Sequence, residues 1–262
     1  MFLREIDFSK FSSIKIGPKV EVLEIDEIGE IPKDIFLIGG ANNLLISPNP
    51  PKLAVLSKKF DYIFEDKDGI HIGAATSGGK VLSYAKKYNL KGFELLQKLP
   101  GTMGGIVKMN AGLKEFCISD NLINVLANGT KTAKNDIDFG YRKSGIQGVI
   151  FEAVFAKIEG FDYALFEMFK NMRNNQPNLP SAGSCFKNPP NDFAGRLLDK
   201  AGFKGRRIGN MAFSDMHANF LVNHGNGTYE EAITLINEAE ETIFEKFGIK
   251  LELEIEIIRK NF

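Results

Sequence analysis

The sequence predicts a folded globular protein that mixes short β-strands with amphipathic helices. Of its 262 residues, 44% are hydrophobic and 25% are charged, an ordinary globular composition that excludes disordered and fibrous classes. Short apolar runs separated by glycine, proline and asparagine indicate strands, and apolar residues at helical spacing indicate helices. At about 150 residues per domain, the length allows one large domain or two modest ones.

The strands are predicted from apolar runs bounded by turn residues. The last of them alternates leucine or isoleucine with Glu252, Glu254 and Glu256, so these three glutamates are expected on one face. The predicted strands span residues 20–25, 35–38, 44–46, 53–56, 62–64, 70–72, 122–127, 148–158, 217–223 and 251–257.

Four helices are predicted, at residues 77–88, 161–173, 193–201 and after Thr228. The last one begins with a capping box, Thr228 with Glu231, and ends at Gly248. Between the second and third helices, the proline-containing break at residues 176–180 is the best candidate for a domain boundary.

Charge and composition exclude several partners. Lysine plus arginine equals aspartate plus glutamate at 33 each, so nucleic acid and anionic membranes are not expected to bind. The N-terminus is charged and no apolar run approaches a membrane span, so a cytoplasmic protein is expected. Cys117 and Cys185 fit reduced thiols. The three histidines, at 71, 217 and 224, form no metal-binding pattern with them, so no metal site is predicted.

Two glycine-rich loops are the main functional signal. Residues 100–105, Pro-Gly-Thr-Met-Gly-Gly, fit neither helix nor strand periodicity, and residues 39–43, Gly-Gly-Ala-Asn-Asn, follow a predicted strand. Such loops allow positive φ, let a ligand approach the main chain, and can hold phosphate oxygens with successive N–H groups. A single loop of this kind is equally well explained as a surface turn. The pair favours a nucleotide cofactor, although no G-x-G-x-x-G motif signals a Rossmann site.

Residues of catalytic type lie near other chain breaks. They are Arg142, Ser184 with Lys187, His217 and Glu254. Taken singly, each has an ordinary structural explanation: a surface ion pair, a turn serine, a buried imidazole, or one of three solvated carboxylates. Spacing alone does not favour Glu254 over its two neighbours.

Six stretches in order resemble the UDP-N-acetylenolpyruvoylglucosamine reductases. These flavoenzymes complete UDP-N-acetylmuramate in bacterial peptidoglycan synthesis, and thereby serve cell-wall biogenesis, cell shape and division. Together the six stretches form a specific pattern that spans nearly the whole chain. They are IGGANNLLIS (38–47), KLPGTMGGIVKMNAG (98–112), FGYRKS (139–144), PSAGSCFKNP (180–189), AGFKG (201–205) and SDMHANFLVNHG (214–225).

The resemblance implies an α+β fold in two parts. A two-lobed FAD-binding domain of the PCMH/VAO type is expected at residues 1–174, with lobes at about 1–56 and 57–174. A smaller α+β substrate-binding domain is expected at residues 175–262, with the last strand able to return to the first lobe.

The resemblance also implies an enzyme with non-covalent FAD and NADPH as the reductant. Hydride passes from NADPH to FAD and then to C3 of the enolpyruvyl group of UDP-N-acetylglucosamine enolpyruvate. Arg142 matches the cation that faces the substrate carboxylate and the developing enolate, and Glu254 matches the acid that assists it. Ser184 matches the hydroxyl that gives its proton to C2, a task that depends on geometry.

The remaining site residues are also carried over from the matching motifs, and a monomer is expected. Substrate binding is assigned to Tyr141, Lys187, Asn188 and His217. Cofactor binding is assigned to Gly39, Gly40, Ala41, Asn42, Asn43, Leu44, Leu45, Pro100, Gly101, Thr102, Gly104, Gly105, Asn110 and Gly112.

The chain departs from the family pattern at three places. Ala41 and Asn42 stand where relatives commonly have glycine and serine, and Cys185 follows the expected proton donor where many relatives have an apolar residue. The chain also lacks the tyrosine-bearing loop of the longer class. A flavin oxidase is a rival interpretation, but the first loop contains no histidine for a covalent flavin. A non-catalytic flavin-binding module is another, and it would not need Arg142, Ser184 and Glu254.

Overall fold

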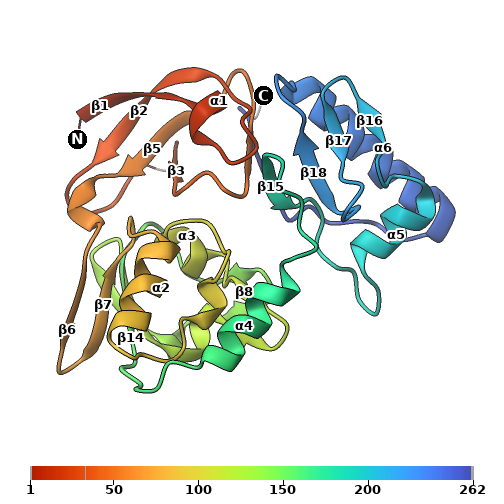
Figure 1. The fold of residues 1–262 in the computed structure, drawn as a ribbon. Helices are drawn as coiled ribbons and strands as arrows, with labels where there is room; N and C mark the ends of the chain where they lie inside the picture. The colour runs from red at the N-terminus through yellow and green to blue at the C-terminus, as the bar shows by residue number, and fades with distance from the viewer. Residues whose placement is uncertain (1, 33, 261–262) are drawn as a thin grey trace. The chain divides into compact units, whose positions relative to one another are not determined.

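A computed structural model describes residues 2–32 and 34–260 of the chain (Figure 1). Strands and helices are mixed, and the largest sheet is antiparallel, so the predicted α+β class is confirmed. The chain divides into two compact units. Among the described residues, unit 1 comprises 2–4, 22–32, 34–40 and 52–174, and unit 2 comprises 5–21, 41–51 and 175–260.

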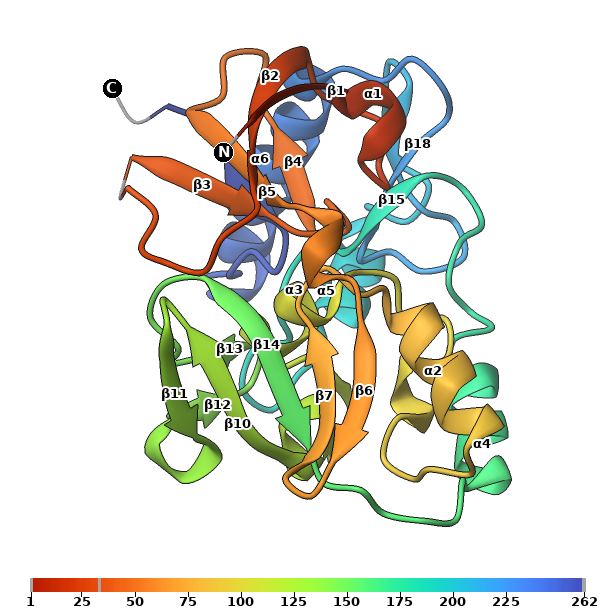
Figure 2. The ribbon, with the colours of Figure 1, turned by 90° about the vertical axis from the view of Figure 1, so that its left-hand side faces the viewer.

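Unit 1 contains a five-stranded antiparallel sheet in the order β11-β10-β14-β7-β6 (Figure 2). The central strand β14 and its neighbour β7 are almost entirely buried, as their apolar sequences predict. The strands are β6 (Ile63–Asp66), β7 (Gly69–Gly73), β10 (Leu122–Ala127), β11 (Thr130–Ala133) and β14 (Ile150–Phe155).

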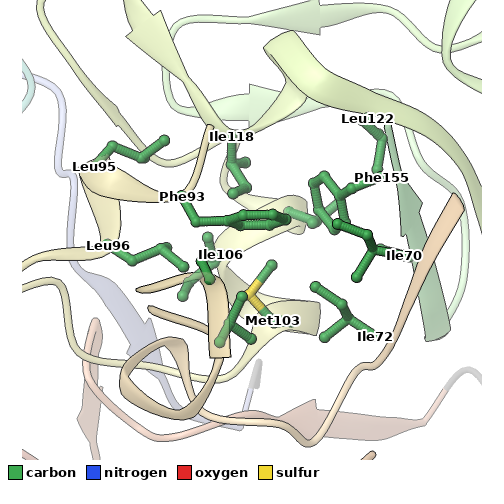
Figure 3. Close-up of a cluster of buried hydrophobic side chains, with 14 of the residues drawn as sticks. Ile70, Ile72, Phe93, Leu95, Leu96, Met103, Ile106, Ile118, Leu122 and Phe155 are labelled. Atoms are coloured by element: carbon green, nitrogen blue, oxygen red, sulfur yellow. The ribbon is translucent and has the colours of Figure 1, made fainter. Parts of the chain in front are cut away.

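Three helices complete the larger part of unit 1: α2 (Gly78–Lys87), α3 (Met103–Lys108) and α4 (Tyr163–Met172). The short helix α3 packs against β7 and β14. Met103 and Ile106 of α3 point into a buried cluster in which the ring of Phe93 lies centrally and stacks edge-on against Phe155 (Figure 3). Each such buried side chain contributes about 1.5–3 kcal/mol. The core therefore fixes α3 and the loop before it on the sheet.

A second sheet places the first glycine loop. Strand β5 lies between β2 and β3, and both pairings are parallel. Because β3 ends at Ile38, Gly39 and Gly40 leave the sheet directly at the carboxyl end of that strand. The strands of this sheet are β1 (Phe2–Asp7), β2 (Lys19–Ile25), β3 (Ile35–Ile38) and β5 (Lys52–Leu56).

Unit 2 is built on an antiparallel sheet in the order β15-β18-β17-β16, against which the long helix α6 packs. Leu235, Ile236 and Ala239 of α6 are buried in one core with Phe213 of the sheet. The elements are β15 (Ser181–Ser184), β16 (Arg207–Ile208), β17 (Met211–Phe213), β18 (Phe220–Asn223), α5 (Ala194–Ala201) and α6 (Tyr229–Phe247).

The predicted boundaries of α6 are confirmed. The hydroxyl of Thr228 accepts a hydrogen bond from the Glu231 N–H at 3.1 Å, and the Glu231 carboxylate accepts one from the Thr228 N–H at 3.1 Å. At the other end Gly248 adopts φ +66°, the left-handed conformation that glycine tolerates best.

The chain end pairs with a strand from the first half of the sequence. Within unit 2, β19 (Glu256–Ile258) runs parallel to β4 (Leu44–Ile46), with Glu256 opposite Leu44. The predicted strand at 251–257 is therefore wrong in its bounds. Residues 251–255 are irregular because the N–H groups of Glu254 and Ile255 both lie near the Cys185 carbonyl oxygen, at 2.9 and 3.3 Å.

The strand predicted at 217–223 is also too long, because β18 begins at Phe220. Residues 217–219 form a turn in which the Phe220 N–H donates to the His217 carbonyl at 3.0 Å.

The division into two units is not a single cut near residue 174, because residues 5–21 and 41–51 belong to the same unit as residues 175–260. The remaining short elements are α1 (Phe8–Phe11), β8 (Gly112–Leu113), β9 (Phe116–Cys117), β12 (Phe139–Gly140), β13 (Lys143–Ser144), η1 (Lys58–Phe60), η2 (Glu94–Leu96), η3 (Ile118–Asn121) and η4 (Lys134–Asp136).

Candidate active site

In unit 1, the loop at residues 100–105 is anchored to the sheet through its own backbone. Gly101 has φ +127°, and its carbonyl accepts a hydrogen bond from the Gly78 N–H at 2.9 Å. The N–H groups of Met103 and Gly104 donate to the carbonyls of Thr76 and Ala74, at 2.8 and 2.9 Å. These two amides are already bonded within the protein, so a ligand at this loop would have to use other donors.

The two predicted glycine loops meet within unit 1. A Cβ atom built on Gly39 would lie 2.7 Å from the Thr102 Oγ1 and 4.0 Å from the Gly105 Cα and N. Contacts under about 3 Å are too short for a carbon atom, so Gly39 cannot carry a side chain unless Thr102 moves. Position 39 of the first loop requires glycine because the second loop lies directly against it.

The glycines of the second loop have different reasons to be glycine. A Cβ on Gly112 would lie 2.3 Å from the Phe116 carbonyl, and one on Gly104 would lie 3.0 Å from the Ala74 Cβ, so packing explains both. Gly105 differs. It is exposed on α3, and the nearest atom to its Cβ position is the Thr102 Oγ1 at 3.9 Å. Glycine in a helix costs about 1 kcal/mol relative to alanine, so the fold alone gives no reason for it.

Asn110, which follows α3 two residues after its end, carries a buried polar side chain. Its φ is +42°, and its Nδ2 donates to the Gly140 carbonyl at 3.1 Å, which ties the loop to the β12–β13 hairpin. Its Oδ1 is buried and has no hydrogen-bond partner among the described residues. Because an unpaired buried acceptor is costly, this oxygen fits a site that a ligand N–H completes.

Arg142 lies in the two-residue turn between β12 and β13. Its φ is +56°, an uncommon conformation for a side chain of this size, and its guanidinium lies 5.0 Å from the centroid of the Tyr141 ring. Tyr141 is 53% exposed, so it is accessible to a ligand. The hairpin is held to α3 by the Ser144 hydroxyl, which donates to the Lys108 carbonyl at 2.8 Å.

A buried arginine near Arg142 was not identified from the sequence. Arg173 is 5% exposed and donates to the carbonyl oxygens of Leu95, at 2.9 Å, and Gln97. Burial, together with the neighbouring charge of Arg142, lowers the pKa of Arg173 to about 10. No motif marks it, because an arginine at the end of a helix is usually solvated.

In unit 2, the segments that contain Ser184 and Glu254 lie side by side. The Lys187 N–H donates to the Glu252 carbonyl at 2.8 Å, Phe186 forms a bridge with Leu253, and the Glu254 N–H donates to the Cys185 carbonyl at 2.9 Å. These contacts place Glu254 next to the residue that follows Ser184. The sequence spacing of 70 residues gives no indication of this proximity.

The three terminal glutamates have different environments. Glu252 is 73% exposed at its side chain and forms an ion pair with Lys187. Glu256 is exposed on β19, whereas Glu254 is half-buried. The regular strand from which the single face was predicted is absent at 251–255, where the chain is irregular. Glu254 is the one that lies in a partly desolvated position beside residue 185.

Cys185 is a core residue. Its side chain is fully buried, and burial, with smaller contributions from Glu240 and Glu254, raises the pKa of the thiol well above its usual value. A thiol in these surroundings packs as a small apolar group. The neighbouring Ser184, at the end of β15, is half-buried.

The predicted substrate-binding residues of unit 2 all take part in local structure. Lys187 pairs with Glu252, and the Asn188 Oδ1 accepts from the Ala194 N–H at 3.1 Å at the start of α5. The His217 Nδ1 accepts from the Asn219 N–H at 3.3 Å, and burial lowers the pKa of this imidazole. His217 is therefore favoured in its neutral form.

Residues 41–45 continue the first loop in unit 2. Ala41 is buried with φ +50°, and its carbonyl accepts from the Ser13 N–H at 3.1 Å. The Ser13 hydroxyl also lies 3.2 Å from the Asn42 carbonyl. Leu44 and Leu45 are buried, and Leu45 belongs to the core, so their side chains support the loop from behind.

Asn219 is a further residue that sequence reasoning missed. Its Nδ2 donates to the Phe186 carbonyl at 2.8 Å, and its Oδ1 accepts from the Phe186 N–H at 3.0 Å. Asn219 therefore fixes the segment after Ser184 through both backbone groups of Phe186. It lies within the motif at 214–225, but nothing in the sequence indicates its partner.

Comparison with known proteins identifies the family. The reductase named UDP-N-acetylenolpyruvoylglucosamine reductase from Helicobacter hepaticus is 49% identical over 258 residues, covering 97% of this chain and 98% of that protein. The protein of the same name from Campylobacter jejuni strain RM1221 is also 49% identical over 258 residues, covering 97% and 99%. The chain belongs to the UDP-N-acetylenolpyruvoylglucosamine reductase family. A model of the C-terminal domain of this reductase matches residues 175–258.

A solved structure supports the same family. The crystal structure of UDP-N-acetylenolpyruvylglucosamine reductase from Thermus caldophilus matches with a TM-score of 0.84 at 27% identity, covering 98% of this chain and 99% of that one. Among residues 2–32 and 34–260, no helix is long and apolar enough to cross a membrane. Within the same residues, no three side chains of histidine, cysteine, aspartate or glutamate form a group that could hold a metal ion.

Proposed function

We propose that this protein is an NADPH-dependent flavoprotein reductase, a UDP-N-acetylmuramate dehydrogenase. It converts UDP-N-acetylglucosamine enolpyruvate to UDP-N-acetylmuramate, a peptidoglycan precursor. Family membership over 97% of the chain supports the reaction. The observation that carries the cofactor assignment is the exposed Gly105, which lies beside Gly39 and which the fold itself does not require.

The residues of unit 1 fit a flavin nucleotide. Gly105 leaves room for close approach to the backbone, and the Asn110 Oδ1 is an acceptor in need of a donor. We assign FAD to a two-lobed flavin-binding region at residues 1–174, to which unit 1 also contributes Gly40, Gly101 and Thr102. When bound, FAD would carry the hydride of NADPH to C3 of the enolpyruvyl group.

The other roles belong to side chains of this chain. The guanidinium of Arg142 binds the substrate carboxylate and stabilises the negative charge that develops on it. The hydroxyl of Ser184 gives its proton to C2. Glu254, which is half-buried, assists in stabilising the negative charge of the developing enolate. Lys187, Asn188 and His217, in the substrate-binding region 175–262, orient the sugar nucleotide, and Tyr141 of unit 1 is also assigned to substrate binding. The reaction is expected in the cytoplasm, by a monomer that binds no nucleic acid.

A visible spectrum with a turnover assay tests this function. Purified protein should be yellow, should release its flavin on denaturation, and should oxidise NADPH with multiple turnovers only when UDP-N-acetylglucosamine enolpyruvate is added. UDP-N-acetylglucosamine without the enolpyruvyl group is the matched control and should support no turnover. A colourless protein that takes up no FAD, or NADPH oxidation that ignores the substrate, would contradict the proposal.

A further inference from the structure

Asn43 connects the first glycine loop to the chain end that contains Glu254. Both segments belong to unit 2. The Asn43 Nδ2 donates to the Glu254 carbonyl oxygen at 2.8 Å, and the Asn43 carbonyl accepts from the Glu256 N–H at 2.9 Å. Asn43 thus holds the main chain on both sides of Ile255, through the carbonyl before it and the N–H after it.

These bonds replace the ladder that a regular strand would provide. Residues 251–255 are irregular, and β19 begins only at Glu256. On its other side, the Glu254 N–H donates to the Cys185 carbonyl. The main chain of Glu254 is therefore fixed by two partners, Asn43 and Cys185, and the second is covalently bonded to Ser184.

We propose that Asn43 is a positioning residue for Glu254: its backbone belongs to the flavin loop, while its side-chain amide serves the protonation half of the reaction. This inference rests on the proposed function. Asn43 is the last residue of the first glycine loop, and Cys185 follows Ser184. The main chain of Glu254 therefore contacts both segments through hydrogen bonds of its backbone groups. Loss of the amide donor leaves the Glu254 carbonyl without this partner and lets its carboxylate shift.

The test separates the two half-reactions of the FAD-loaded protein by stopped-flow absorbance. In Asn43→Asp, which keeps the size but not the amide donor, flavin reduction by NADPH should stay within about threefold, while reoxidation by substrate slows about 100-fold, as expected for a displaced catalytic group. The FAD dissociation constant should change little. Amide hydrogen exchange at residues 254–256 should increase in the same variant.

Asn43→Ala, which cannot repel the Glu254 carbonyl, should show the same split. Asn223→Asp is the matched control, because this buried asparagine donates to the Ile14 carbonyl at 3.0 Å and has no assigned role in the reaction. It should lower Tm but preserve the ratio of the two half-reactions.

Three outcomes would overturn the proposal: equal slowing of both half-reactions, weakened FAD binding with a normal rate of reoxidation, or failure of both Asn43 variants to fold. Wild-type protein that shows no substrate-dependent turnover would instead overturn the proposed function itself.

Discussion

The second glycine loop of unit 1 and the Ser184–Phe186 segment of unit 2 are held in place by opposite means. The loop is fixed from behind by an apolar core around Phe93 and presents a surface on which Gly105 carries no side chain. The Ser184–Phe186 segment is held by polar side chains, since Asn219 hydrogen-bonds both the N–H and the carbonyl of Phe186. The first region depends on the absence of a side chain at Gly105, whereas the second depends on the side chain of Asn219. The two should therefore respond differently to substitution.

The largest effect is expected for Ser184→Ala. Removing a positioned acid costs about 10²–10⁴-fold in rate, so reoxidation of the flavin by substrate should slow by that factor. Flavin reduction by NADPH should be nearly unchanged, because the role proposed for Ser184 is confined to protonation of C2. Single-turnover absorbance at the flavin band measures both steps.

Ser181→Ala is the control for this experiment. Ser181 lies on the same strand, β15, and its hydroxyl accepts from the Gly183 N–H at 3.2 Å. Turnover in this variant should match wild type. Equal loss of both half-reactions in Ser184→Ala would show that Ser184 supports binding or folding, and the contrast between the two regions would then fail.

The sequence predicted elements well where the signal is local. The capping box of Thr228 and Glu231 and the apolar stripe of α6 depend on neighbours three and four residues apart, and these boundaries were correct. The strand at 251–257 failed because a long-range contact with the Cys185 carbonyl overrides its period-2 pattern. Alternation gives a face only where the chain is a regular strand.

The site divides in the same way. Glycine-rich loops and polar residues at chain breaks could be picked from the sequence, and their family resemblance supplied roles. The proximity of Gly39 to Thr102, and the bonds of Asn43 and Asn219, join residues far apart in sequence, so no local pattern records them. The same holds for Arg173, whose burial lies entirely in tertiary packing.

A smaller, two-part effect is expected for Gly105→Ala. The apo protein should become more stable by about 1 kcal/mol, because alanine is the better helix former and the new methyl has room. FAD should nevertheless bind more weakly, by about tenfold or ~1.4 kcal/mol, if the cofactor approaches this backbone. Urea denaturation of the apo protein and FAD titration measure the two parts separately.

Gly79→Ala is the matched control. Gly79 is an exposed glycine near the start of α2, and a Cβ there meets nothing within 4 Å. It should be stabilising to a similar extent and should leave FAD binding unchanged. Unchanged FAD affinity in Gly105→Ala would contradict the assignment of FAD to the backbone at Gly105.

The smallest effect concerns pH and the polar segment of unit 2. Burial lowers the pKa of His217 below its usual 6.5, so as pH falls the unfolded chain takes up this proton before the folded protein does. The contribution of His217 to stability is therefore complete above pH 6.5 and is lost as pH falls below that value. His217→Gln, whose side-chain oxygen can still accept the Asn219 N–H, should flatten the dependence of Tm on pH between about 7.5 and 5.5. At pH 8 His217 is neutral in both the folded and the unfolded wild-type protein. The difference in Tm between variant and wild type at that pH gives the pH-independent cost of the substitution. An equally steep pH dependence in the variant would mean that this imidazole stays solvated, and that the turn after Ser214 is held without it.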